Sequence, residues 1–288
     1  MSSQPYGLEW FKPENLYDYA AVVIVVVSIG LTNKIHPFER PFDPNDPDLS
    51  HPHWKTDIVP MATAFAVTVG VPIAVVTIFA AIKAAYGASA VAGRGHKWAL
   101  ATFLVTVHDF CLPFVLTIEL TSLFTDVVKN WAGRLRPDFL DRCRWSAETH
   151  ACTGDPALIL DGRRSFFSGH SSFSFAGFTF LALYLSDALG IFAHQTKPRG
   201  LAFRLTLIIM LFLIPSYIAI SRTQQYIHHP TDVMTGSLFG VFMAVVGYRA
   251  HFKARLPSHQ QQPDLADVEG GRPSEDSFNF DDRLRLVS

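Results

Sequence analysis

Residues 100–137 read LATFLVTVHDFCLPFVLTIELTSLFTDVVKNWAGRLRP, an apolar run that ends in a group of cations. The apolar part, 100–127, exceeds the roughly 20 residues that a helix needs to cross the hydrocarbon core of a bilayer. It carries His108, Asp109, Glu119 and Asp126, and ionisable groups at that depth face other helices rather than lipid. We therefore expect a membrane-spanning helix with one side packed against protein.

Five further apolar runs predict five more membrane-spanning helices. The chain has 288 residues, of which 49% are hydrophobic, and its mean hydropathy is +0.21. This pattern predicts an all-α, polytopic membrane protein with six transmembrane helices. The predicted spans are 16–34, 59–85, 100–127, 172–192, 201–220 and 232–248.

The spans define a six-helix membrane domain over 16–256. A short N-terminal segment, 1–15, precedes it, and a tail, 257–288, follows it. The tail holds seven acids and three bases among Gln, Pro and Ser residues, too few apolar groups to bury a face, so we expect it to be disordered. An even number of spans places both segments on the same side of the membrane.

Charge excludes one class of partner and leaves the orientation open. The chain has 24 Lys and Arg residues against 25 Asp and Glu residues, without the basic surplus of a nucleic-acid-binding protein. Leaving aside the three arginines of the tail, ten Lys and Arg residues lie on the side of the termini and eleven on the other side. The positive-inside rule therefore does not assign the cytosolic side.

The chain has three cysteines and no CxxC pair, which excludes a structural zinc site or a dense disulfide framework. Cys143 and Cys152 share one polar loop. They would be joined if that loop faces an oxidising compartment, and the sequence leaves both states open.

Three polar clusters lie where the predicted helices leave or enter one face of the membrane. The first contains Lys129, Arg134, Arg136 and Pro137, the second is Ser168-Gly169-His170, and the third runs from Ser221-Arg222 through His228-His229 to Asp232. Each cluster alone also fits an ordinary structural role: cations at a helix end, an N-cap or a surface pair on a helix. Their convergence on one face favours a functional site.

The cations of these clusters indicate a phosphate pocket. Lys129, Arg136 and Arg222 supply positive charge, and a guanidinium grips phosphate oxygens with two hydrogen bonds. A helix that begins at Ser168-Gly169 directs free N–H groups and its dipole toward an anion. The sequence contains neither a P-loop nor a carboxylate cluster suited to magnesium, so we expect no metal and no cofactor.

Two histidines can then divide the chemistry of phosphoryl transfer. Asp232 follows His228 by one helical turn and can hold the imidazole tautomer that attacks phosphorus, which makes His228 the candidate nucleophile. His170 is the candidate general acid for the leaving oxygen and the later base for water. Because His229 adjoins His228, spacing alone leaves an exchange of their roles open.

The three motifs, K-x6-R-P, S-G-H and S-R-x5-H-x3-D, resemble those of the type-2 phosphatidic acid phosphatase superfamily. The likeness extends to its lipid phosphate phosphatase branch through Pro37–Arg40 and Gly133–Leu140, and residues 138–143 look most like the fungal diacylglycerol pyrophosphate phosphatases. It covers roughly residues 16–250. One departure is Phe167, where the family usually has proline before Ser-Gly-His.

The resemblance implies a Mg²⁺-independent membrane enzyme that hydrolyses phosphatidate, diacylglycerol pyrophosphate and lysophosphatidate through a phosphohistidine. It implies a site on the lumenal or extracellular face, with both termini cytosolic. It also assigns residue roles, with His228 as nucleophile, Asp232 as its partner and His170 as acid. The residues it places on phosphate are Lys129, Arg136, Ser168, Gly169 and Arg222.

Several alternatives remain open at this point. The motifs bind only phosphate, so sphingoid-base phosphates, polyprenyl pyrophosphates or a sugar phosphate are other substrates to consider. A different class would be a transporter that uses Asp109, Glu119 and Asp126, or an inactive phosphate-binding relative. The sequence does not resolve a vacuolar, ER, Golgi or plasma-membrane location, the oligomeric state or the preferred lipid.

Overall fold

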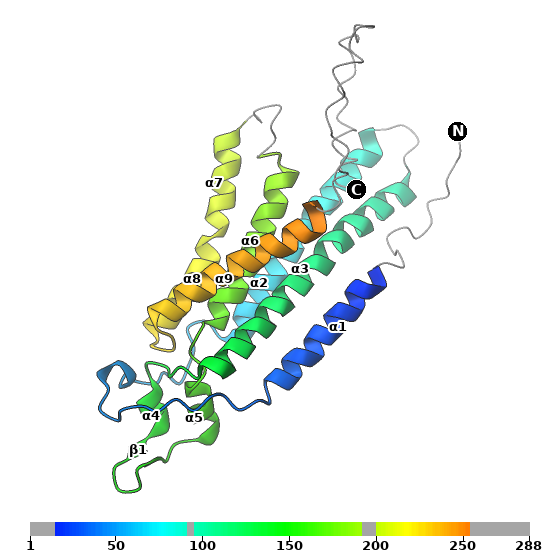
Figure 1. Cartoon of the computed structure of the whole chain (residues 1–288). Helices are drawn as coiled ribbons and strands as arrows, with labels where there is room; N and C mark the ends of the chain where they lie inside the picture. Colours follow the sequence, from blue (N-terminus) through cyan, green and yellow to red (C-terminus); the bar gives the residue numbers. More distant parts are fainter. Residues whose placement is uncertain (1–14, 91–94, 192–199, 254–288) are drawn as a thin grey trace, which may run out of the picture.

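The computed structural model describes residues 15–90, 95–191 and 200–253, and within these ranges the regular secondary structure is helical apart from one short β-hairpin (Figure 1). The long elements form a bundle, and the short ones that precede α6 gather at one end of it. In chain order the elements are α1 (Asn15–Thr32), η1 (Pro47–Leu49), α2 (Met61–Ala90), α3 (His96–Ala132), α4 (Phe139–Cys143), β1 (Trp145–Ser146), β2 (Ala151–Cys152), α5 (Pro156–Gly162), α6 (Gly169–Ala188), α7 (Leu201–Leu211), α8 (Leu213–Gln224), α9 (Pro230–Tyr248) and η2 (Arg249–Lys253).

Among the described residues, five helical segments are long and apolar enough to cross a membrane, which confirms a polytopic helical membrane protein. They are Asn15–Thr32, Met61–Gly87, His96–Ala132, Leu201–Gln224 and Pro230–Phe252. The predicted span 172–192 corresponds to α6, which starts three residues earlier and is not among the five. Apart from Asn15, the predicted segments 1–15 and 257–288 lie outside the described residues.

The helix α6 occupies the centre of the bundle. It packs against α2, α3, α8 and α9, and its residues Phe178, Phe180 and Leu181 are fully buried. Because protein rather than lipid surrounds it, this helix tolerates serines that would be costly on a lipid-facing surface. Its low hydropathy is therefore a consequence of its position.

Two glycines allow α9 to approach α6 closely. A Cβ atom at Gly236 would lie 2.6 Å from the carbonyl oxygen of Ser168, and one at Gly240 would clash with the carbonyl oxygen of Ser172. Small residues at helix contacts let backbones pack closely in membrane proteins. The approach places the start of α9 beside the start of α6.

An aromatic core holds the other half of the bundle together. Phe110 and Phe114 of α3 contact Phe180 of α6 edge to face, with ring centroids 5.6 Å apart in each pair. Tyr248 of α9 packs on the same Phe180 ring at 5.6 Å. This cluster fixes α3, α6 and α9 relative to one another and thereby positions the polar end of the bundle.

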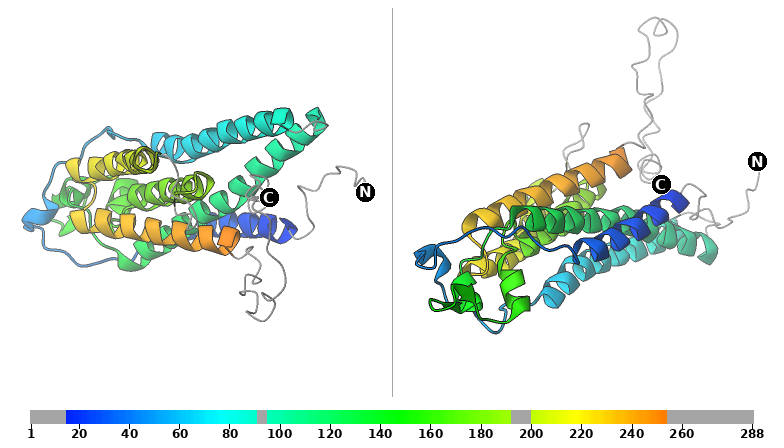
Figure 2. Two further views of the ribbon diagram at one scale, coloured as in Figure 1. Left: turned by 90° about the horizontal axis from the view of Figure 1, so that it is seen from above. Right: turned by 60° about the horizontal axis from the view of Figure 1, so that its bottom comes forward.

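We call the segments 33–60 and 133–168 the cap. They lie at the end of the bundle opposite the start of α1 and the end of α9, as all three views in Figures 1 and 2 show. The cap has a small core of its own, in which Leu49, Leu135, Phe139 and Cys143 are buried together. The three predicted motif clusters lie in the cap or directly beneath it.

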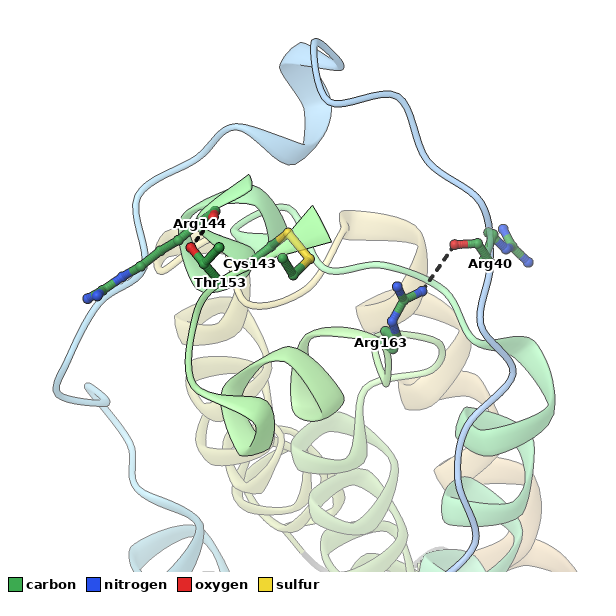
Figure 3. The surroundings of a disulfide bond; sticks show 6 residues. Arg40, Cys143, Arg144, Thr153 and Arg163 are labelled. Atoms are coloured by element: carbon green, nitrogen blue, oxygen red, sulfur yellow. Dashed lines mark hydrogen bonds between the residues drawn. A yellow bond between two sulfur atoms is a disulfide. The ribbon is translucent and has the colours of Figure 1, made fainter. Parts of the chain in front are cut away.

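A disulfide joins Cys143 to Cys152 in the cap, which settles a question that the sequence left open (Figure 3). It links the end of α4 to β2. Nearby, Thr153 donates from Oγ1 to the carbonyl oxygen of Arg144 at 2.7 Å, and Arg163 donates to the carbonyl oxygen of Arg40 at 3.1 Å. These contacts tie the hairpin and α5 to the segment that follows α1.

Candidate active site

The last turn of α3 brings Lys129 to the start of α6. Gly133 has a left-handed φ of 53°, and its N–H donates to the carbonyl oxygen of Lys129, which ends α3. Lys129 is 9% exposed, and its Nζ would lie 3.2 Å from a Cβ atom at Gly169. The first two predicted motifs therefore meet in space.

A carboxylate from the cap holds Arg136. The guanidinium donates from Nε to the carbonyl oxygen of Asp161 at 2.9 Å and from Nη2 to its Oδ1 at 2.7 Å. Arg142 donates to the other oxygen, Oδ2, at 2.8 Å. Burial raises the pKa of Asp161, but the charges of Arg136 and Arg142 outweigh it and lower the pKa to about 2. The carboxylate is therefore ionised and orients Arg136.

Behind Arg136 lies a second, fully buried ion pair. Arg142 donates from Nε and Nη2 to the two oxygens of Asp138 at 2.9 and 2.8 Å, and His53 contacts the same carboxylate at 2.8 Å. Burial lowers the pKa of Arg142, but its hydrogen bonds to Asp138 and the charge of that carboxylate raise the value overall. Two hydrogen bonds between one guanidinium and one carboxylate fix the relative orientation of the two groups, so this pair fixes the base of the cap.

The second motif forms the first turn of α6. Within the described part of the chain, the Ser168 side chain makes no capping hydrogen bond to this helix, and its Oγ instead receives a hydrogen bond from Ser171 at 3.0 Å. The Ser168 N–H donates to the carbonyl oxygen of Asp232 at 3.1 Å, which joins the second motif to the third. His170 contacts the carbonyl oxygen of Val59 through Nε2 at 3.2 Å.

Arg222 is buried at the end of α8 with its guanidinium held on three sides. Its Nε donates to Ser221 Oγ at 3.0 Å and its Nη2 to Gln225 Oε1 at 3.2 Å, while its Nη1 lies 3.3 Å from Asp57 Oδ1. The side chain is 1% exposed. A cation this deeply buried needs an anionic partner, and Asp57 supplies one.

His228 precedes α9, and Asp232 lies in the first turn of that helix. The distance from His228 Nδ1 to Asp232 Oδ2 is 3.7 Å, longer than a hydrogen bond. Ser165 stands close to both, with its Oγ 2.6 Å from Asp232 Oδ2 and 3.5 Å from His228 Nδ1. Burial lowers the pKa of His228 to about 3, although Asp232 opposes the shift. His228 is therefore neutral near pH 7.

Asp232 also anchors two other groups. Arg134 donates to its Oδ1 at 2.7 Å, and the His229 N–H donates to its Oδ2 at 3.1 Å, which completes a capping box at the start of α9. The His229 ring contacts the carbonyl oxygen of Leu135 at 3.1 Å. The ring of His229 is thus engaged with the segment that follows α3, whereas that of His228 faces Asp232 and Ser165.

The predicted site residues therefore gather at one place. Lys129 and Arg222 both lie within electrostatic reach of His170, and Lys129 and Arg136 both lie within reach of His228. Across the described ranges, no three His, Cys, Asp or Glu side chains gather as a metal site would require. The chemistry that this set supports is the binding of a phosphate group between cations, with two histidines beside it.

The structure adds residues that the motifs do not contain. Residues 51–59 cross the site and touch all three motifs: the His51 N–H donates to the carbonyl oxygen of Pro137, and Asp57 and Val59 contact Arg222 and His170. Gln225 binds this segment by accepting from the Ile58 N–H and donating to the Thr56 carbonyl oxygen, both at 2.8 Å. The only signal in the sequence was that these residues follow the first predicted span on the same face. Ser165, three residues before Ser168, gave no separate signal.

Comparisons of the sequence with known proteins identify relatives of this chain. The family model described as the PAP2 superfamily matches residues 110–256. The chain is 34% identical to diacylglycerol pyrophosphate phosphatase 1 of Saccharomyces cerevisiae, over 80% of this chain and 78% of that protein. It is 32% identical to probable lipid phosphate phosphatase 4 of Arabidopsis thaliana, over 83% and 73%, and 28% identical to phospholipid phosphatase 1 of Mus musculus, over 79% and 82%.

No solved structure matches the chain. The family assignment therefore rests on the sequence comparisons, which cover the motif residues and the helices that carry them. By these matches, the chain belongs to the PAP2 superfamily and is a lipid phosphate phosphatase.

Proposed function

We propose that the protein removes phosphate from phosphatidate, diacylglycerol pyrophosphate and lysophosphatidate without a metal ion. The observation that carries this proposal is the convergence of Lys129, Arg136 and Arg222 with His228 at the start of α6. Positive groups fixed in a buried site stabilise the charge that develops during phosphoryl transfer. Gly169 would add an N–H donor from the helix start, and Ser168 would add its hydroxyl, because its own N–H is bound to the Asp232 carbonyl oxygen.

In the first step, His228 attacks phosphorus and the bond from phosphorus to the lipid oxygen breaks. The Nδ1 atom of His228 faces Asp232 and Ser165, which leaves Nε2 as the nucleophile. His170 donates a proton to the leaving oxygen, so that the free lipid alcohol or phosphatidate departs. The Nε2–H of His170 binds the Val59 carbonyl oxygen, so Nδ1 is the atom that exchanges the proton.

In the second step, water attacks the phosphohistidine. His170, now neutral, takes a proton from the water, and the bond from phosphorus to His228 Nε2 breaks to release inorganic phosphate. The ring of His229 is engaged with the Leu135 carbonyl oxygen, which favours His228 over His229 as the nucleophile.

The test is phosphate release from phosphatidate and diacylglycerol pyrophosphate in detergent micelles with excess EDTA, with wild type and His228→Ala side by side. We expect release by the wild type alone. Loss of the wild-type activity in EDTA would refute the metal-independent mechanism. If neither lipid is a substrate, sphingoid-base and polyprenyl phosphates are tested next, and transport that persists in His228→Ala would establish a transporter instead.

We further propose that α6 also crosses the membrane, which gives six transmembrane helices over 16–256. We place the site on the lumenal or extracellular face. The disulfide between Cys143 and Cys152 supports this orientation, because disulfides persist in oxidising compartments. An added glycosylation sequon tests it. Ala147→Asn creates Asn-Glu-Thr in the exposed turn between β1 and β2, and we expect glycosylation in a eukaryotic host. Glu275→Asn creates Asn-Asp-Ser near the C-terminus and should stay unmodified, and the reverse pattern would overturn the orientation.

A further inference from the structure

An apolar groove of about 370 Å³ runs between α2 and α8. Both helices also pack on the central helix α6. Thr63 and Val67 of α2 lie on one side of the groove, and Leu213, Ile214 and Tyr217 of α8 lie on the other. The groove opens on the side of the bundle that faces lipid, where Leu213 is 64% and Tyr217 60% exposed.

One end of this groove reaches the candidate active site. Val59 and Ile218 line that end and share a buried cluster with Phe173 of α6. The carbonyl oxygen of Val59 is the group that binds His170, and that of Ile218 accepts from Ser221, the residue before Arg222. The groove therefore begins within one helical turn of the proposed acid and of a proposed phosphate-binding arginine.

The groove then leads away from the site along both helices. Its residues on α2 span about one turn near the helix start, and its residues on α8 precede Arg222 by four to nine positions, so the groove extends about 13.5 Å from that residue at 1.5 Å per residue. This direction runs from the cap toward the middle of the bilayer. A lipid whose phosphate lies on Arg222 would have its glycerol at the groove end and a tail pointing into the membrane.

We infer that this groove binds one acyl chain of the lipid phosphate substrate. The inference rests on the proposed function, since it assumes that the phosphate binds at Lys129, Arg136 and Arg222. An apolar groove continuous with a phosphate pocket matches an amphipathic ligand at both ends, and each methylene that it buries contributes to binding. A soluble phosphate ester would use only the polar end.

Two substitutions that fill the groove test the inference. Thr63→Trp and Ile214→Trp place a bulky ring in it from opposite sides, and Ile78→Trp on α2 and Ile209→Trp on α7 are controls, because both residues are exposed outside it. We compare kcat/KM for dioleoyl and dibutanoyl phosphatidate. The preference for the long chains should fall about tenfold in the groove variants, equivalent to about 1.4 kcal/mol, and should stay unchanged in the controls. An unchanged preference in folded groove variants would overturn the inference.

A binding experiment separates this inference from the proposed function. Phosphatidate with a diazirine partway along one acyl chain, at a distance from the phosphate that falls within the groove, is photolysed with the full-length protein in nanodiscs, and labelled peptides are mapped by mass spectrometry. We expect labels at Thr63–Val67 and Leu213–Ile218 that the groove variants lose. Equal labelling by a diazirine phosphatidylcholine would show a general lipid site and refute a substrate site. If no phosphatidate is hydrolysed, the proposed function fails, and the labelling still shows whether the groove binds an acyl chain.

Discussion

Removal of a single buried hydroxyl should slow this enzyme markedly. Ser165 is fully buried, and its Oγ lies between the proposed nucleophile and the carboxylate that was expected to orient it. The direct distance from His228 to Asp232 is 3.7 Å. We therefore expect Ser165 to donate to Asp232 and to accept from the Nδ1–H of His228, so that the tautomer of the nucleophile depends on both residues.

The size of the effect follows from the hydrogen bonds that are lost. A hydrogen bond to a charged group contributes about 1.5–3 kcal/mol, and each 1.36 kcal/mol changes a rate about tenfold. Ser165→Ala should therefore lower kcat about ten- to a hundredfold. The KM for phosphatidate should change little, because the motif cations rather than Ser165 hold the phosphate in the proposed complex.

The assay is steady-state phosphate release by wild type, Ser165→Ala, Asp232→Asn and the double variant. Ser174→Ala is the matched control, since Ser174 is a fully buried serine whose hydroxyl donates to the backbone carbonyl oxygen of Ser171 rather than to a carboxylate. Because Ser165 acts through Asp232, the two effects should not add. A Ser165→Ala enzyme within twofold of wild type, or full additivity, would refute the bridging role.

Three further predictions concern the cap and the loop before α6. Asp161→Asn leaves Arg136 without its anionic partner, so we expect KM for phosphatidate to rise about tenfold, measured by steady-state kinetics; an unchanged KM would contradict this. Replacing both Cys143 and Cys152 by alanine should lower the free energy of unfolding by roughly 2.5 kcal/mol, visible as a lower melting temperature that reductant no longer affects. Phe167→Pro should keep phosphatase activity, since the backbone N–H that proline lacks has no catalytic role, but should unfold more easily because a buried ring is lost; near-complete loss of turnover would show that the loop has a catalytic role.

The sequence predicted the parts of the fold that repeat a simple physical rule. Lipid-facing helices must be apolar over their length, and five such segments were found near their predicted positions. The helix α6, which corresponds to the remaining predicted span, shows why the rule is incomplete. Its contacts are with protein, so Ser171, Ser172 and Ser174 can lie buried in it, and its interior position is set by tertiary packing that no window along the chain records.

The candidate site, like the fold, was predicted only in part. Lys129, His170 and Arg222 could be placed at one face because helix ends fix where the chain enters and leaves the membrane. Asp57 and Asp161, the carboxylates that hold Arg222 and Arg136, lie in the cap, outside the predicted spans. Which loop residue meets which arginine depends on how the cap folds over the bundle, and that information is distributed over contacts far apart in the chain.

The cap also explains why counting charges did not assign an orientation. Of the eleven cations on this side, Arg134, Arg136, Arg142, Arg164 and Arg222 are paired with carboxylates, and Lys129 is buried at the start of α6. These cations are required by the cap and by the candidate site, so their number reflects the fold rather than the topology, and the positive-inside rule loses its signal on this side. The count of eleven against ten therefore carries no information on orientation, and the proposed orientation rests on the disulfide in the cap.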